Sequence, residues 1–297
     1  MKQGFVKVAS ATPRIRVADP VYNAQVICEQ AKEAAEHGAK IVVFPELCIT
    51  GYTCNDLFLQ ELLLEKAKEA LLTIAEETGQ LETLFLVGLP VDKDGRLYNV
   101  AAVLYRGRIL GMIPKKNIPM YAEFYEGRHF TPGEETVTEY RLGKQVIPFG
   151  SNLLFRCEEL PELILGCELC EDLWVAEPPS TSHALMGATV IANLSASNET
   201  VSKDDYRTLL IKASSARLLC GYIYTSAGEG ESTQDLVFGG HDLIAENGTL
   251  LVQSARFTTG ILYTDLDVLK ISSERRRMGT FGKRPMKPYL TVPFSMQ

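Results

Sequence analysis

Short apolar runs, separated by segments with helical periodicity, limit what this chain can fold into. Residues 41–44 and 84–89 are apolar throughout, and each run is followed by a proline. Runs of this length without polar alternation are typical of strands that are covered on both faces. Before the first run and between the two, apolar residues recur at helical spacing over residues 20–37 and 56–78, which we expect to be helices. The pattern predicts a mixed sheet with helices outside it.

The second half of the chain repeats this alternation. Strands are expected at residues 163–169, 190–192 and 222–225, with a hairpin turn at Asn247-Gly248. A helix is expected over residues 206–220, and its buried side is predicted to hold Leu209, Leu210, Ala213 and Ala216. Two sheets packed face to face would account for so many wholly apolar strands. The expected fold class is therefore α/β, with two mixed sheets and flanking helices.

The charge balance and the cysteine count favour a cytoplasmic protein without nucleic-acid or membrane partners. The 297 residues include 30 basic and 37 acidic side chains, a net charge of -7, whereas a nucleic-acid partner would require a basic face. No apolar run reaches the ~18–20 residues that span a bilayer, and the first residues do not read as a signal peptide. The seven cysteines are an odd number, which suggests free thiols.

Three segments place a chemically useful side chain where an apolar strand ends. Glu46 follows residues 41–44, Lys115 and Lys116 follow a strand ending near residue 113, and Cys170 follows a strand ending at residue 169. In open α/β sheets, ligands gather at such strand ends. Each residue also has an ordinary interpretation taken alone: a solvated loop acid, a solvated lysine pair, or a buried structural cysteine.

The spacing Cys167-x-x-Cys170 raises two further alternatives. A zinc site would normally need a second pair of ligands, but the four histidines are scattered along the chain. A thiol–disulfide exchange motif would lie at the start of a helix and not at the end of a strand. Both alternatives are weaker than a single site made from the three segments.

A thiol, a carboxylate and an ammonium group can together form a catalytic site. The thiol is a weak nucleophile until it loses its proton, which a nearby carboxylate can accept. A nearby ammonium group favours the thiolate and can later stabilise an oxyanion. This arrangement needs no histidine and follows the same logic as a serine–histidine–aspartate triad.

The three segments resemble the catalytic motifs of the nitrilase, or carbon–nitrogen hydrolase, superfamily. The matching stretches are Phe44-Pro45-Glu46, Pro114-Lys115-x-x-Ile118-Pro119 and Cys170-Glu171-Asp172. The resemblance implies an α-β-β-α sandwich in which Glu46 is the general base, Lys115 stabilises the oxyanion and Cys170 is the nucleophile. It also implies that Glu126 supports the lysine. Lys116 and Cys167 are the neighbours that the motifs pass over.

Longer matches resemble the glutaminase domain of glutamine-dependent NAD synthetases. They lie at residues 50–58, 170–175, 178–180, 193–199 and 226–238, so that the resemblance covers residues 5–265. It implies hydrolysis of L-glutamine to glutamate and ammonia through a cysteine thioester, without a metal or an organic cofactor. It also implies a glutamine pocket, whose expected residues are Tyr52, Tyr121, Phe124, Glu171, Trp174 and Ser197. The four aromatic residues in this set have an alternative role as core residues.

Nothing in the sequence resembles the pyrophosphate loop of a synthetase domain. We therefore expect residues 1–270 to form the glutaminase domain and residues 271–297, rich in basic residues, to be a tail or linker. ATP and deamido-NAD would bind a synthetase domain that partners this one in cis or in trans, and homo-oligomers are expected. The alternatives are a free-standing amidase acting on another small amide, and a catalytically silent interaction module.

Overall fold

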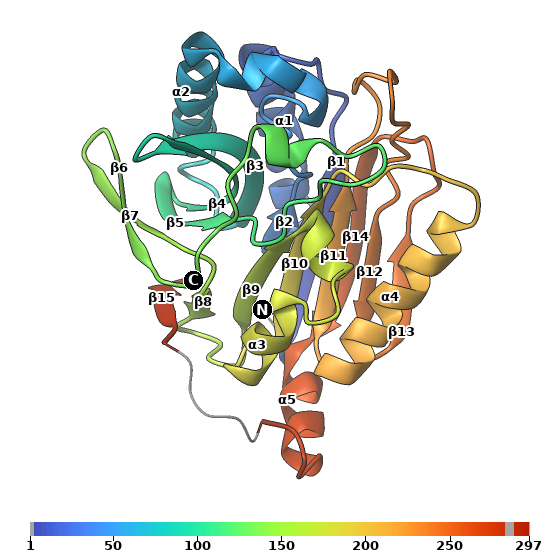
Figure 1. The fold of residues 1–297 in the computed structure, drawn as a ribbon. Helices are drawn as coiled ribbons and strands as arrows, with labels where there is room; N and C mark the ends of the chain where they lie inside the picture. Colours follow the sequence, from blue (N-terminus) through green and yellow to red (C-terminus); the bar gives the residue numbers. More distant parts are fainter. Residues whose placement is uncertain (1–2, 283–287, 297) are drawn as a thin grey trace.

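Two β-sheets lie face to face, and helices cover the outer face of each (Figure 1). This computed structural model describes residues 3–282 and 288–296. The arrangement is the α-β-β-α sandwich that the sequence predicts, so the predicted fold class is confirmed.

The first sheet carries the N-terminal half of the chain and one later strand. Its central strands are parallel neighbours, and the chain then turns back and forth through three hairpins. In spatial order the strands are β14 (Gly260–Asp267), β1 (Phe5–Thr12), β2 (Ile41–Val43), β3 (Leu84–Lys93), β4 (Arg96–Tyr105), β5 (Arg108–Pro114), β7 (Gln145–Phe149) and β6 (Thr138–Leu142).

The second sheet has a parallel centre made of β9, β10 and β11. Antiparallel strands flank this centre on both sides. In spatial order the strands are β13 (Thr249–Gln253), β12 (Leu243–Glu246), β11 (Gly221–Ser226), β10 (Val190–Ser195), β9 (Ile164–Leu169), β8 (Leu153–Cys157) and β15 (Leu290–Phe294).

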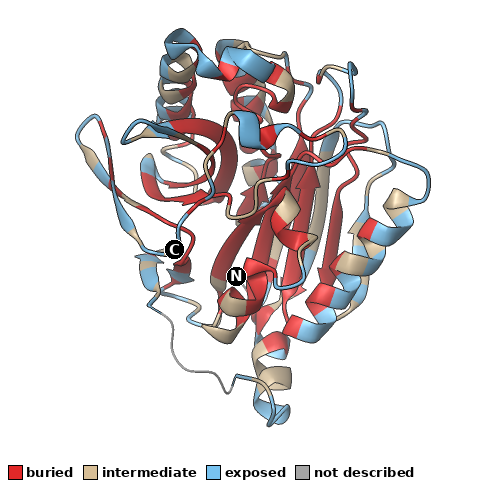
Figure 2. Ribbon diagram, in the orientation of Figure 1, coloured by how far each residue is buried: buried red, intermediate tan, exposed pale blue. Residues whose placement is uncertain are grey.

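Three apolar layers hold the sandwich together. The middle layer lies between the sheets and is formed by inward-facing residues of both, such as Val43 of β2 and Leu169 of β9. One outer layer packs α1 (Pro20–Glu36) and α2 (Glu61–Glu77) on the first sheet. The other packs α3 (Pro179–Leu185) and α4 (Lys203–Leu218) on the second. Figure 2 shows the result: the central strands are buried almost throughout, whereas edge strands such as β6 and the outer sides of the helices are exposed.

The expected helix from residue 56 begins later than the sequence suggests. Residues Tyr52–Leu59 form a short 3-10 segment, η1, which departs from helical geometry at Thr53 and is interrupted at Asn55, where φ is 49° and ψ is -133°. The α-helix proper begins at Glu61. The apolar periodicity of this region therefore spans two elements.

The buried side of α4 differs from the one the apolar spacing predicts. Leu209 is 62% exposed, whereas Arg207, Ile211, Ser214 and Ser215 are buried. Arg207 is fully buried because its guanidinium group donates hydrogen bonds to Glu199 and to the carbonyl of Asn198. The buried hydrogen bonds of Arg207 have thus decided which side of this helix faces the sheet, and not the spacing of its leucines.

The segment expected as a tail or linker contains most of α5 (Val268–Arg277) and all of β15. Strand β15 pairs in parallel with β8 at the edge of the second sheet. The guanidinium of Arg275, on α5, donates hydrogen bonds to carbonyls at the ends of α3 and α4, including those of Ala188 and Leu218. These parts of residues 271–297 are therefore packed on the sandwich.

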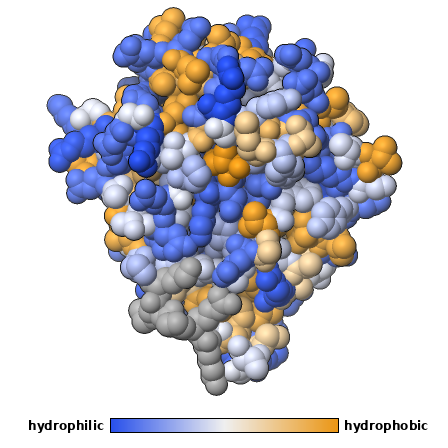
Figure 3. All heavy atoms as spheres, viewed as in Figure 1, coloured by the Kyte–Doolittle hydropathy of each residue, from blue (hydrophilic) through white to orange (hydrophobic). Residues whose placement is uncertain are grey.

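The surface mixes polar and apolar residues, as the face in Figure 3 shows. Among residues 3–282 and 288–296, no helix has both the length and the apolar character needed to cross a membrane. All seven cysteines lie in the described part of the chain, and each is buried and free of a disulfide.

Gly88 on β3 lets the segment after β2 pass close to the sheet, and its replacement tests this packing. A Cβ atom there would lie 2.3 Å from the Leu47 nitrogen and 2.6 Å from the Pro45 carbonyl oxygen. Because both are backbone atoms, we expect Gly88→Ala to destabilise the fold by about 1–3 kcal/mol. Urea unfolding measures the change. Gly279→Ala, where a Cβ would meet nothing within 4 Å, is the matched control, and equal stability of the two variants would contradict the packing.

Candidate active site

Four strands from the two sheets end at one place, and each is followed by a residue of the candidate site. Strand β2 leads to Glu46, β5 to Lys115, β9 to Cys170 and β10 to Ser197. The backbone N–H of Glu46 donates to the carbonyl of Ser195 at 3.3 Å, which links the two sheets at this edge. The tertiary structure thereby brings together residues that are more than 150 positions apart.

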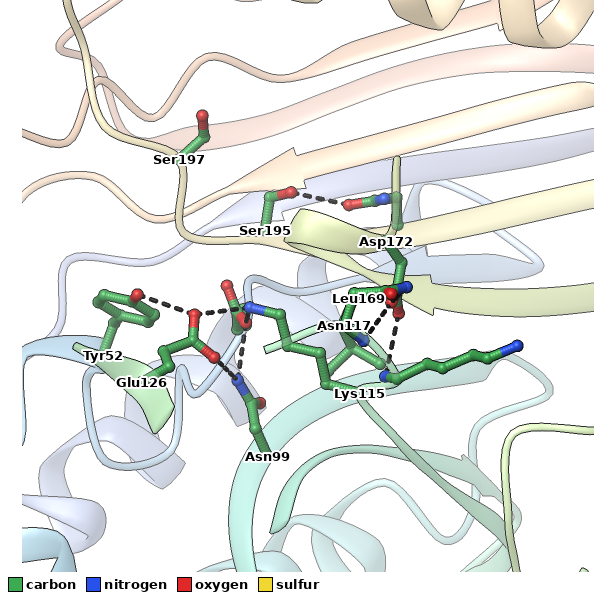
Figure 4. A network of polar contacts seen from close by, with 12 residues as sticks. Tyr52, Asn99, Lys115, Asn117, Glu126, Leu169, Asp172, Ser195 and Ser197 are labelled. Atoms are coloured by element: carbon green, nitrogen blue, oxygen red, sulfur yellow. Dashed lines mark hydrogen bonds and ion pairs between the residues drawn. The ribbon is translucent and has the colours of Figure 1, made fainter. Parts of the chain in front are cut away.

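The ammonium group of Lys115 lies between two carboxylates (Figure 4). Its Nζ is 2.7 Å from Oε1 of Glu46 and 2.6 Å from Oε1 of Glu126. The side-chain amide of Asn99 donates to both acids, at 2.7 Å to Glu46 and 3.4 Å to Glu126. The side chains of Lys115 and Glu46 are completely buried, so this pairing is what makes their charges tolerable inside the protein.

Burial and charge pairing have opposite effects on the pKa values of Glu46 and Lys115. Burial raises the pKa of Glu46 to about 7, although the positive charge of Lys115 acts against the shift. Burial lowers the pKa of Lys115, but the negative charges of Glu126 and Glu46 outweigh it and hold the pKa well above its usual value. Lys115 therefore stays charged at neutral pH, whereas Glu46 can exchange a proton there.

One oxygen of Glu46 remains available for that exchange. Its Oε1 accepts from Lys115 and Asn99, but its buried Oε2 has no hydrogen-bond partner among the residues that the structure describes. A buried acceptor without a donor is uncommon and is often found at functional sites. This oxygen is suited to accept a proton from a neighbouring group.

Cys170 begins η3 (Cys170–Leu173), directly after β9. Its φ of 39° is unusual for a residue with a side chain and marks a sharp turn between strand and helix. Burial and the charge of Glu46 raise the pKa of the Cys170 thiol, and the charge of Lys115 acts in the opposite direction without cancelling them. At neutral pH the thiol is therefore protonated and needs a base before it can act as a nucleophile.

The neighbours that the motifs pass over lie elsewhere. Cys167 faces the apolar layer between the sheets. Lys116 points to the surface, where its ammonium group is 2.6 Å from Glu135. The structure thus separates Lys115 from Lys116 and Cys170 from Cys167, as the motif spacing suggests.

Asp172 joins the cysteine turn to the lysine segment. Its Oδ2 accepts the Leu169 N–H at 3.1 Å, and its Oδ1 accepts the backbone and side-chain N–H groups of Asn117 at 2.8 and 2.7 Å. Both sets of contacts appear in Figure 4. One buried carboxyl group therefore fixes the positions of Cys170 and Lys115 relative to each other.

A cavity of about 490 Å³ opens onto Cys170. Five of the six residues expected to bind substrate line it: Tyr121, Phe124, Glu171, Trp174 and Ser197. The hydroxyl of Tyr121 donates to Glu171 at 2.8 Å. The volume suits a small-molecule ligand, for which pockets of ~300–1,000 Å³ are usual.

Tyr52, the sixth expected residue, does not line this cavity. It lines a neighbouring one of about 50 Å³, and its hydroxyl donates to Oε1 of Glu126 at 2.8 Å. Tyr52 therefore lies outside the cavity that opens onto Cys170 and joins the polar network through Glu126.

Two residues that contribute to the site were missed in the sequence. Asn99 is a polar residue within an apolar stretch of β4, and that exception was a usable signal. Lys203 opens α4 and reads as an ordinary exposed helix start, yet it lines the cavity, with its ammonium group 5.0 Å from the ring centre of Trp174 and 5.6 Å from that of Phe124. Nothing local distinguishes such a lysine from a solvated one.

No group of three or more histidine, cysteine or acidic side chains suited to hold a metal ion occurs within residues 3–282 and 288–296. The polar groups around Cys170 instead suit acyl transfer, since they combine a thiol, a proton acceptor and a buried cation.

The family model described as carbon-nitrogen hydrolase matches residues 7–276. The chain belongs to the carbon–nitrogen hydrolase family. Its recognition from the three strand-end motifs is thereby confirmed, and the chain is an enzyme of the type that cleaves carbon–nitrogen bonds.

Curated relatives of this hydrolase chain are longer proteins. It is 43% identical to the glutamine-dependent NAD(+) synthetase of Mycobacterium tuberculosis over 282 residues, which cover 94% of this chain and 42% of that protein. It is 32% identical to the glutamine-dependent NAD(+) synthetase of Thermotoga maritima over 97% of this chain and 47% of that one. The chain thus spans less than half the length of these two relatives.

Solved structures agree with the fold of this hydrolase. The crystal structure of a glutamine-dependent NAD(+) synthetase from Cytophaga hutchinsonii has a TM-score of 0.80 and 28% identity, and the likeness covers 88% of this chain and 43% of that one. An amidase of the nitrilase superfamily from Nesterenkonia has a TM-score of 0.70 and 21% identity, covering 93% of this chain and 96% of that one. The second likeness speaks for the fold alone.

Proposed function

We propose that this chain hydrolyses L-glutamine to glutamate and ammonia through a thioester on Cys170. The observation that carries the proposal is the cavity that opens onto Cys170, next to the Glu46–Lys115–Glu126 network. One acidic and one basic side chain, Glu171 and Lys203, line this cavity. That the relatives of this chain are glutamine-dependent NAD(+) synthetases supports the choice of substrate.

The two charged residues of the cavity match the amino-acid end of glutamine. Glu171 and Lys203 both line it, and their charges interact, since that of Lys203 lowers the pKa of Glu171 against the larger effect of burial. In this proposal the carboxylate of Glu171 holds the α-ammonium group and the ammonium of Lys203 holds the α-carboxylate. Ser197 supplies a further hydroxyl. An uncharged amide would leave the charges of Glu171 and Lys203 without an ionic partner in the ligand, which weakens its binding.

The first half of the reaction forms the thioester. Glu46 accepts the Cys170 proton at Oε2 as sulfur attacks the side-chain carboxamide carbon, and the carbonyl oxygen becomes an oxyanion. Lys115 has three N–H donors, of which Glu46 and Glu126 engage two. The third, with the backbone N–H of Glu171, stabilises the oxyanion. Glu46 then passes its proton to the nitrogen, the carbon–nitrogen bond breaks, and ammonia leaves.

The second half regenerates the cysteine. Glu46 accepts a proton from water, whose oxygen attacks the thioester carbon, and the oxyanion is held as before. The carbon–sulfur bond then breaks, glutamate leaves, and the sulfur regains a proton from Glu46. Every step uses a group of the chain itself, so the proposed reaction needs no metal and no organic cofactor.

The ammonia would be used by a second catalytic part. The relatives are more than twice as long as the matched region, and we infer that their remaining part is a synthetase that amidates deamido-NAD, in cis or in trans to a chain such as this one. ATP and deamido-NAD would then bind that part. We keep the boundary near residue 270, homo-oligomerisation and a cytoplasmic location as parts of this proposal; seven free cysteines suit a reducing compartment.

Replacing the nucleophile tests the proposed reaction directly. We expect Cys170→Ala to abolish ammonia release from L-glutamine while the protein stays folded, because Cys170 is the cysteine that lines the cavity. Cys167→Ala, which removes a buried thiol from the same strand, should keep activity. A coupled ammonia assay measures both variants, and turnover by Cys170→Ala would refute the assignment.

The pH dependence of the reaction reports on the proposed base. Because burial raises the pKa of Glu46 to about 7, this carboxyl group is protonated below that pH and cannot accept the thiol proton. We expect kcat/KM to fall about tenfold for each pH unit below 7. A rate that is independent of pH between 5 and 8, on a protein shown to be folded there, would exclude Glu46 as the base.

A substrate panel separates a glutaminase from an amidase for other small amides. We expect glutamine to be preferred to butyramide and to N-carbamoyl compounds, because only glutamine pairs with both Glu171 and Lys203. Lys203→Met should raise KM for glutamine about tenfold or more and leave that for butyramide unchanged. Equal use of glutamine and butyramide by the unchanged protein would favour the amidase.

A further inference from the structure

We propose that Glu231 is a positioning residue for this site: it holds the start of η1 so that the hydroxyl of Tyr52 stays on Glu126. The inference rests on the proposed function, since it concerns the network that would activate Cys170. Glu231 lies on the loop between β11 and β12, which contains no proposed catalytic residue.

The carboxylate of Glu231 accepts three hydrogen bonds from a segment almost 180 residues away. Its Oε1 accepts the Tyr52 N–H at 2.7 Å, and its Oε2 accepts the N–H and the hydroxyl of Thr53 at 3.0 and 2.6 Å. The N–H of Ser232 donates back to the Thr53 hydroxyl at 2.9 Å. Glu231 is only 8% exposed, so these contacts replace the water that the carboxylate has lost.

The contacts satisfy a physical need of both partners. Tyr52 and Thr53 are the first residues of η1, whose leading N–H groups have no acceptor within the helix. The preceding residue, Gly51, has no side chain to cap them. Glu231 thus acts as a helix cap that comes from a distant loop.

The loop itself has little room to move. Gly230 has a φ of 106°, and a Cβ atom on it would lie 1.9 Å from the carbonyl oxygen of Ile15. The Ile15 N–H also donates to the carbonyl of Glu229 at 3.2 Å. The backbone before Glu231 therefore packs closely against Ile15, in the segment that follows β1. This contact fixes the position of Glu231.

Tyr52 carries the effect of this cap to the lysine. Its hydroxyl donates to Oε1 of Glu126, the same oxygen that accepts from Lys115 at 2.6 Å. Its ring packs edge-on against Phe238, with 5.7 Å between ring centres. Glu231 and Phe238, both on the β11–β12 connection, therefore hold the backbone and the ring of one tyrosine, and the tyrosine hydroxyl orients Glu126.

This role explains two of the long sequence matches that the proposed reaction does not use. Residues 50–58 contain the capped turn, and residues 226–238 contain both Glu231 and Phe238. Neither segment supplies a group that would touch the reacting atoms. Together the two segments hold Tyr52 in place, and Tyr52 in turn orients Glu126.

Glu231→Gln tests the proposal, with Glu229→Gln as the matched control. The glutamine keeps the size of the side chain but has one acceptor oxygen, and its NH2 group would face an N–H of η1. Glu229 is an exposed acid on the same loop, paired with Arg14. We expect Glu231→Gln to lower kcat for glutamine about tenfold with KM changed less than twofold, since a small misplacement of catalytic groups costs this much. Glu229→Gln should match the unchanged protein.

A double-mutant cycle with Tyr52→Phe identifies the route of the effect. If Glu231 acts through the Tyr52 hydroxyl, Glu231→Gln should reduce kcat less than twofold when that hydroxyl is already absent. A full tenfold loss in the Tyr52→Phe background would overturn the proposal, because the two changes would then be independent. Wild-type kcat in Glu231→Gln alone would overturn it as well.

Two further variants cover the case in which Glu231→Gln does not fold. Thr53→Val removes the hydroxyl that binds Glu231 and should lower kcat in the same way, whereas Thr53→Ser keeps the hydroxyl and should not. Circular dichroism checks that each variant is folded. Equal activity of Thr53→Val and Thr53→Ser would count against the cap.

Alkylation of Cys170 by iodoacetamide, followed by peptide mass spectrometry, separates this proposal from the proposed function. The reaction needs the same base and cation but no particular substrate. If the wild-type protein releases no ammonia from glutamine, but Cys170 is alkylated about tenfold more slowly in Glu231→Gln, the glutaminase function is refuted and the positioning role of Glu231 stands. Equal alkylation in both proteins, with ammonia released by the wild type, would do the reverse.

Discussion

The ammonium group of Lys115, buried between two carboxylates, is the interaction on which the rest of the site depends. An unpaired charge inside a protein costs several kcal/mol, and here the side chain is fully out of contact with solvent. Glu46 and Glu126 offset that cost only when they lie within hydrogen-bond distance at the same time. The fold must therefore hold three segments in register, and the surrounding polar contacts serve this need.

Those contacts come from every side of the network. Asn99 bridges the two acids from β4, Asp172 ties the cysteine turn to the segment after Lys115, and Tyr52 closes the far side of Glu126. All but the Asn117 contact of Asp172 are hydrogen bonds between buried groups, where a missing partner is expensive. Among the described residues, one oxygen of Glu46 has no donor, and the proposed chemistry uses that oxygen.

Sequence reasoning succeeded where a local pattern has one physical meaning. Apolar runs predicted the buried strands, and the strand-end motifs led to the family and to its two-sheet fold. It failed where a distant contact decides. The buried side of α4 was assigned from its leucines, yet Leu209 is exposed, because Arg207 is held inside by Glu199 and the Asn198 carbonyl. The helix expected from Asp56 begins at Glu61, because residues 52–59 form the separate segment η1, whose first N–H group is bonded to Glu231.

The sequence by itself determined the fold class, the family and the identity of the residues at the strand ends, because periodicity and motif order are properties of the chain alone. The tertiary structure decided which of those residues meet. It placed Tyr52 behind Glu126, it brought Lys203 into the cavity beside Glu171, and it left one face of Glu46 open. Spacing along the chain carries no information on such contacts, because burial and charge pairing arise only when two sheets stack and their strand ends meet at one edge.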